Sequence, residues 1–63
     1  MEAYQQRVVD EKTELDDKLA KLQAFIGGKI YETLPPEERG RLIHQRLCMQ
    51  GYSQVLGERI AAF

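Results

Sequence analysis

Side chains that could perform catalysis or bind a metal ion are present in this chain, but not in the required combinations. Asp10, Glu14 and Asp17 share one face of a helix by their spacing, so their carboxylates could surround a hard cation. No histidine and no second row of carboxylates matches them, and the HExxH and CxxC zinc patterns are absent. We therefore interpret these residues as a solvated acidic face, and we expect no metal ion and no cofactor.

The only thiol belongs to Cys48, and His44 lies four residues earlier, within reach on a helix. A catalytic thiol also needs an electropositive surrounding, and nothing else in the sequence completes a nucleophilic site. We interpret Cys48 as a small buried apolar residue, and a single cysteine suits a reducing compartment. The protein is therefore not expected to be an enzyme.

A different set of residue types is suited to binding a nucleotide. Arginine guanidinium groups match phosphate, tyrosine rings stack on a base, and a carboxylate can hold a ribose hydroxyl or a base edge. The candidate ligand-binding residues are Tyr4, Arg7, Glu11, Tyr52 and Arg59. They come from both ends of the chain, so they form a site only if the fold brings the two ends together.

The two long segments that must position them have the apolar spacing of amphipathic helices. The apolar residues of the first are Tyr4, Val8, Leu15, Leu19, Leu22 and Ile26, and those of the second are Leu42, Met49, Tyr52, Leu56, Ile60 and Phe63. Gly27 and Gly28 tolerate a left-handed cap and end the first helix. Pro36 suits the first position of the second helix, although Pro35 supplies no capping side chain.

These signals predict an all-α fold: an antiparallel two-helix hairpin in one domain, residues 1–63. The helices are expected at about 3–26 and 36–62, and the connection 27–35 should contain one short helical turn.

The first apolar row is interrupted where Glu11 and Lys12 stand. Pairing the two rows in antiparallel register places Glu11 beside Tyr52 and Tyr4 near Arg59. Lys12 is expected to turn to solvent. Two interpretations remain open. Glu11 accepts hydrogen bonds from Arg7 or Tyr52 and fixes the register, or the cluster is a ligand pocket at a subunit interface.

A chain of 63 residues buries only about 60% of its unfolded surface, and one cysteine allows no intrachain disulfide. Small scaffolds without such links are commonly stabilised by partner subunits, so we expect homo-oligomerisation into a bundle. Glycine within a helix indicates either close approach of another backbone or of a ligand, or tolerated sequence variation. The predicted interface residues are Val9, Ile43, Leu47, Gly51 and Phe63.

Charge and hydropathy narrow the range of partners. Nine basic and ten acidic residues give a net charge of −1, so duplex nucleic acid is not expected as a partner. No run of about 18 apolar residues is present, so no membrane partner is expected.

Two long stretches, YQQRVVDEKTELDDKLAKLQAFI and LPPEERGRLIHQRLCMQGYSQVLGERIAAF, resemble small phage-encoded helical proteins of unknown function, including relatives in crAss-like phages. The resemblance covers nearly the whole chain except the connection from Gly27 to Leu34. Those proteins often have Ser before a single Pro, where this chain has Pro35. The chain is also similar in size and expected assembly to the phage anti-CBASS and anti-Thoeris sponges, which sequester nucleotide signals between subunits.

The resemblance implies a location in the cytoplasm of an infected bacterium and a role against host defence. Our first hypothesis is a self-assembling protein that binds a cyclic dinucleotide or an ADP-ribose-type signal. The alternatives are an inhibitor or adaptor that binds a host defence protein, or an accessory protein of particle structure or assembly.

Overall fold

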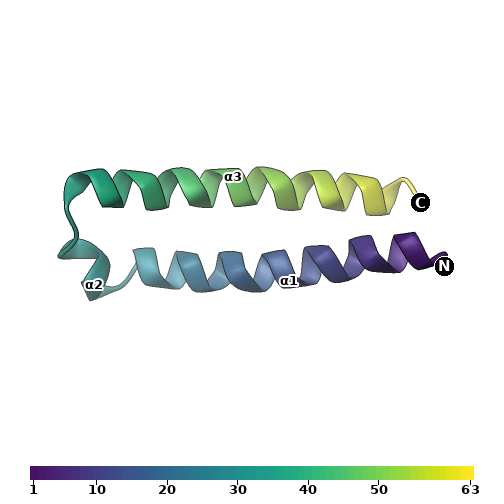
Figure 1. Ribbon diagram of the computed structural model, residues 1–63, viewed down its shortest axis with the longest axis horizontal. Helices are drawn as coiled ribbons and strands as arrows, with labels where there is room; N and C mark the ends of the chain where they lie inside the picture. Colours follow the sequence, from purple (N-terminus) through teal and green to yellow (C-terminus); the bar gives the residue numbers. More distant parts are fainter.

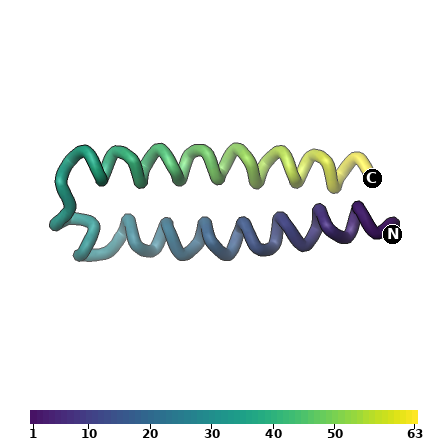
Figure 2. Tube along the Cα trace, in the orientation of Figure 1, coloured from purple at the N-terminus to yellow at the C-terminus, as the bar shows by residue number.

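The computed structural model describes all residues 1–63 and consists almost entirely of helix (Figure 1). Helix α1 spans Ala3–Ile26, α2 spans Lys29–Glu32 and α3 spans Pro36–Ala61. The long helices α1 and α3 lie antiparallel and side by side, and both chain termini lie at the same end (Figure 2). The predicted all-α fold with two long helices packed against each other is confirmed.

The glycine pair ends α1 by a mechanism other than the predicted one. Gly27 has φ −80° and Gly28 has φ −97°, so neither adopts the left-handed conformation. Their N–H groups instead donate to the carbonyl oxygens of Gln23 and Phe25, at 3.1 and 3.0 Å. A Cβ atom at Gly28 would lie 3.3 Å from the Phe25 oxygen. Glycine is favoured at position 28 because the chain turns closely against the last turn of α1.

The start of α3 agrees with the expected absence of a capping side chain. Pro35 occupies the N-cap with φ −57° and ψ 149° and makes no side-chain hydrogen bond. Pro36 follows at the first helical turn, with Glu37 and Glu38 beside it. The two carboxylates interact favourably with the positive end of the helix dipole and partly offset the missing cap.

The hydrophobic core between the two long helices is small. Only Val8, Leu15 and Leu56 are buried, and Met49 and Ile60 pack against them while remaining partly exposed. Leu56 is the most enclosed, with 1% of its surface accessible. The hairpin is a rod of 46 × 14 × 13 Å, so no third layer covers the remaining apolar side chains.

The register of the hairpin differs from the predicted one. The Tyr4 ring packs edge-on against the Phe63 ring, with centroids 6.1 Å apart and an interplanar angle of 75°. The prediction paired Tyr4 with Arg59, which lies four residues, or about one turn, before Phe63. The aromatic contact at the open end and a polar cluster in the middle favour the observed alignment.

Candidate functional site

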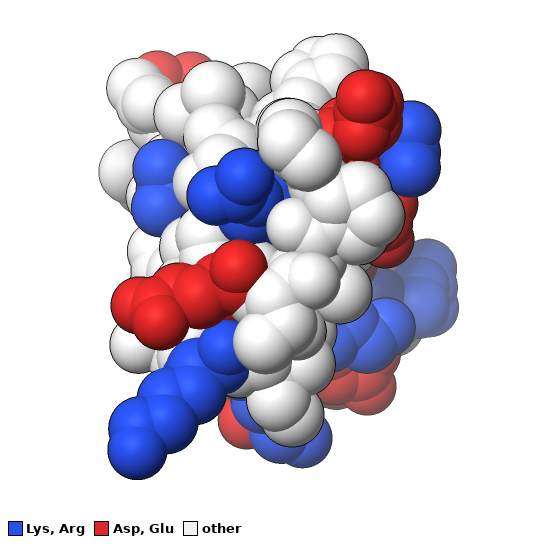
Figure 3. Space-filling view, turned by 90° about the vertical axis from the view of Figure 1, so that its left-hand side faces the viewer, with Lys and Arg blue, Asp and Glu red and all other residues white.

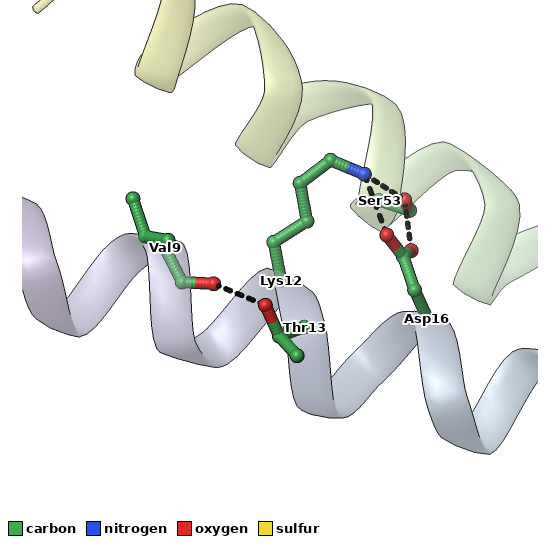
Figure 4. Close-up of polar contacts among 5 residues, drawn as sticks. All are labelled: Val9, Lys12, Thr13, Asp16 and Ser53. Carbon is green, nitrogen blue, oxygen red and sulfur yellow. Dashed lines mark hydrogen bonds and ion pairs between the residues drawn. The ribbon is translucent and has the colours of Figure 1, made fainter.

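The interruption in the apolar row of α1 is filled by Lys12 and not by Glu11. The Lys12 Nζ atom donates to Asp16 Oδ2 at 2.8 Å and to Ser53 Oγ at 2.9 Å, reaching from α1 to α3 (Figure 4). Ser53 Oγ donates to Asp16 Oδ1 at 2.5 Å, which closes the contact. We call Lys12, Asp16 and Ser53 the cross-helix polar cluster.

Two predictions about this interruption are therefore wrong. Lys12 does not turn to solvent, because its ammonium group finds two oxygen partners between the helices. Glu11 is exposed, and it forms neither the predicted ion pair with Arg7 nor a hydrogen bond with Tyr52. The register-fixing role proposed for Glu11 is performed by different residues.

The Lys12 side chain packs over Gly57, where an added Cβ atom would make only ordinary van der Waals contact with it. A Cβ atom added to Gly57 would lie 3.5 Å from Lys12 Cε. The aliphatic part of Lys12 thus passes over bare helix backbone before its charged end reaches Ser53. Long cationic side chains commonly bury their methylene groups in this way.

The electrostatics of the cluster keep Asp16 ionised. The hydrogen bond from Lys12 and then that from Ser53 lower the pKa of its carboxyl group, while desolvation raises it by less. The Lys12 and Asp16 side chains expose 30% and 45% of their surfaces to solvent, so solvent screens the ion pair. The main consequence is geometric, because Ser53 of α3 must stand opposite one turn of α1.

Sequence signals for this cluster exist but are weak. Lys12 and Asp16 are four residues apart, the spacing at which oppositely charged side chains meet on a helix. Ser53 lies on the same face of α3 as Ile60, seven residues later, so it points towards α1. Nothing in the sequence joins the two observations until the register is known.

The five predicted ligand-binding residues all have exposed side chains. Glu11 precedes Lys12 by one position, and Tyr52 precedes Ser53 by one position. Each is therefore turned about 100° around its helix from the neighbouring cluster residue. Because the cluster occupies one side of the hairpin, both residues lie towards the opposite side. Tyr4 and Arg7 share the side of Glu11, and Arg59 shares that of Tyr52. We call Tyr4, Arg7, Glu11, Tyr52 and Arg59 the binding flank.

The binding flank is looser than predicted within one hairpin. Arg7 and Arg59 lie at a similar level, each about one turn inward from the contact between Tyr4 and Phe63. The shifted register moves Tyr52 about one turn beyond Glu11. Neither arginine forms an ion pair with a protein carboxylate, so both guanidinium groups remain open to an anionic ligand.

The predicted interface residues differ in exposure. Val9 and Ile43 are half-buried, whereas Leu47 and Phe63 expose 55% and 43% of their surfaces. Gly51 is exposed, and a Cβ atom there would meet nothing within 4 Å. The surface around Gly51 is therefore open to close approach.

The interpretation of Cys48 as a buried residue is wrong. Its side chain is exposed on α3, because position 48 lies beside the face of α3 that packs against α1 and not on that face. No group of three or more His, Cys, Asp and Glu side chains is arranged to hold a metal ion.

The surface has a mixed charge and no feature of a membrane span. At the end that carries α2, cationic and anionic side chains are interspersed around an uncharged surface (Figure 3). None of the helices contains a stretch sufficiently long and apolar to cross a membrane.

Comparison with known proteins gives one match. A family model described as Sequestin matches residues 2–62, nearly the whole chain. No curated protein and no solved structure matches the chain.

Proposed function

Since the chain belongs to the Sequestin family, we propose that it acts by sequestering a small signalling molecule. In this proposal it is a non-enzymatic phage protein that assembles with itself and binds a nucleotide-type immune signal of the host. The family name supports the sequestering part of the proposal. The chemistry of the binding flank supports the nucleotide part.

The observation that carries the proposal is a pair of unpaired guanidinium groups beside exposed aromatic rings. Arg7 and Arg59 lie on the binding flank without carboxylate partners, and Tyr4 and Tyr52 expose 54% and 45% of their surfaces. Arginine binds phosphate through two parallel hydrogen bonds. Tyrosine rings stack on bases without strict sequence preference. Glu11 adds an acceptor for a ribose hydroxyl or a base N–H group.

A second copy of the hairpin completes the site in this proposal. Small-molecule sites commonly enclose 70–90% of the ligand surface, whereas the single hairpin contains no cavity. The binding flank of one copy therefore forms one wall, and a neighbouring copy supplies the opposite wall. Sequestration and self-assembly are then parts of one activity.

Isothermal titration of the purified protein tests the proposal against cyclic dinucleotides, linear dinucleotides and ADP-ribose derivatives. Arg7→Gln and Arg59→Gln should each weaken binding about tenfold to a hundredfold, because a hydrogen bond to a charged group contributes about 1.5–3 kcal/mol. Lys29→Gln is the matched control, since Lys29 is exposed in α2 and lies outside the binding flank. The absence of heat and of thermal stabilisation with every ligand would overturn the proposal.

A second function, inhibition of a host defence protein by direct binding, is favoured by one observation. Leu47 exposes 55% of its surface beside the half-buried Ile43, which leaves an apolar strip open to a protein partner. Pull-down from host lysate distinguishes the two functions. A stoichiometric protein partner, with no nucleotide in the purified sample, would favour inhibition.

A further inference from the structure

The two long helices differ sharply in how their charges are distributed. Helix α1 carries nine charged residues among its 24 positions. The 16 residues from Leu42 to Gly57 of α3 include a single charged side chain, that of Arg46. This segment therefore has few charges to keep its remaining faces solvated, and in the hairpin only one face of α3 is covered.

The uncovered surface of α3 has a regular pattern. Its side opposite α1, which we call the outer face of α3, contains His44, Leu47, Gly51, Val55 and Glu58. Their spacing of three and four residues aligns them along one stripe. Leu47 and Val55 expose 55% and 51% of their surfaces, and Gly51 leaves the backbone bare between them.

The amount of surface left exposed is consistent with a missing partner. The hairpin exposes 4651 Å², compared with about 4,200 Å² for a compact monomer of 7.3 kDa. The excess, doubled for two copies, is about 900 Å², which is somewhat below the roughly 1,200–2,000 Å² buried in standard protein interfaces. A second copy of the same chain is thus sufficient to account for it.

We propose that two copies of the hairpin pair through the outer faces of α3, which cross antiparallel at Gly51. This inference rests on the self-assembly in the proposed function and specifies its surface. In this arrangement residues equally distant from Gly51 face each other across the interface. Leu47, four residues before Gly51, meets Val55 of the second copy, four residues after it, and Gly51 allows the two backbones to approach.

The Glu58 carboxylate favours the antiparallel arrangement. His44 and Glu58 lie seven residues before and after Gly51, so His44 of one copy faces Glu58 of the second copy. A parallel pair would instead place the carboxylates of both Glu58 side chains beside each other. Like charges directly opposite each other are destabilising, and the antiparallel pair also brings opposite ends of the two helix dipoles together.

The pairing connects the interface with the binding flank. The twofold axis of an antiparallel pair places the Tyr52 side chains of both copies on the same side of the assembly, close to the crossing point. Arg59 lies on that side too, at nearly the same level as Arg41 of the second copy. Two aromatic rings with guanidinium groups at either end then line a groove between the copies.

Cysteine cross-linking tests the arrangement in the absence of nucleotide. In a Cys48→Ser background, Gly51→Cys places one thiol per copy at the crossing, where the Cα atoms come within the roughly 4.4–6.8 Å that a disulfide requires. Gly40→Cys in the same background is the matched control, since Gly40 is equally open but faces residue 62 of the second copy. We expect a disulfide-linked dimer for Gly51→Cys and none for Gly40→Cys. Equal linking of both variants, or none at position 51, would overturn the arrangement.

A substitution in the wild-type background provides an independent readout. Leu47→Glu should convert the dimer to a monomer in sedimentation analysis while the circular dichroism spectrum stays helical. Ala24→Glu, an equivalent change on the exposed side of α1, should leave the dimer intact. A Leu47→Glu protein that remains dimeric would contradict the interface. Because neither experiment uses a nucleotide, a failed interface with retained heat in the titration would overturn this inference alone.

Discussion

Ser53 is the residue through which α3 makes polar side-chain contact with α1. Its hydroxyl accepts a hydrogen bond from Lys12 and donates one to Asp16. The sequence shows an interrupted apolar row at positions 11 and 12, and the choice of Glu11 as the inward residue is wrong because it depends on the assumed register. A shift of about one turn along α3 changes which α3 side chain stands opposite each α1 residue, and the spacing in a single sequence does not determine such a shift.

The lowered pKa of Asp16 predicts an acid-dependent loss of stability. The carboxyl group has a lower pKa in the folded than in the unfolded protein. Its contribution is therefore fully present above its unfolded pKa of about 3.9, and it is lost as the pH falls through the lower folded value. In urea unfolding between about pH 5 and pH 2, Asp16→Asn should show a smaller decrease in stability than the wild type.

Asp17→Asn is the control for this prediction, because Asp17 pairs with Lys21 on the exposed surface and does not contact α3. It should retain the contribution of Asp16 to the acid dependence. If Asp16→Asn and the wild type lost stability in parallel, the cross-helix polar cluster would not exist in solution.

At the scale of the helices, the small core makes single residues decisive. Leu56→Ala removes the most buried side chain from a core of three residues. Large-to-small substitutions at such sites cost about 2–5 kcal/mol, which is comparable with the roughly 3–5 kcal/mol that a single core supplies in a chain of this size. Thermal unfolding followed by circular dichroism should show a large decrease in Tm or a loss of cooperative folding.

Ile30→Ala is a matched change at an exposed position, since Ile30 in α2 exposes 64% of its surface. Exposed substitutions usually change the free energy of unfolding by less than about 0.5 kcal/mol. Equal destabilisation by the two substitutions would mean that Leu56 is not the centre of the core.

Helix positions are the part of the fold that the sequence predicts well. Gly27, Gly28, Pro35 and Pro36 separate two long apolar periodicities, and the structure places its helices between these residues. The candidate site is predicted less well, because its residues come from two helices. Tyr4 and Arg7 share a helix, so their common side follows from spacing alone. The position of Tyr52 along the hairpin, relative to Glu11, depends on the register. It differs by about one helical turn from the predicted position beside Glu11.

At the scale of the whole molecule, the proposal that the hairpin assembles with a second copy rests on its small core and its uncovered surface. The hairpin has three buried residues, and α3 has a charge-poor central segment, Leu42 to Gly57, whose outer face no other element covers. The proposed pairing at Gly51 covers that face and brings Tyr52 of both copies to one groove. Assembly and ligand binding should therefore be lost together in Leu47→Glu, whereas Arg59→Gln should lose ligand binding and keep the assembly. Sedimentation and titration on the same two samples measure both properties.

Native mass spectrometry of the purified protein, incubated with cyclic dinucleotides, linear dinucleotides and ADP-ribose derivatives, tests the central proposal most directly. It reports the number of copies and the number of bound ligands in one spectrum. We expect a dimer, or an assembly of dimers, that retains one of these nucleotides. A strict monomer that retains none of them would contradict the proposal.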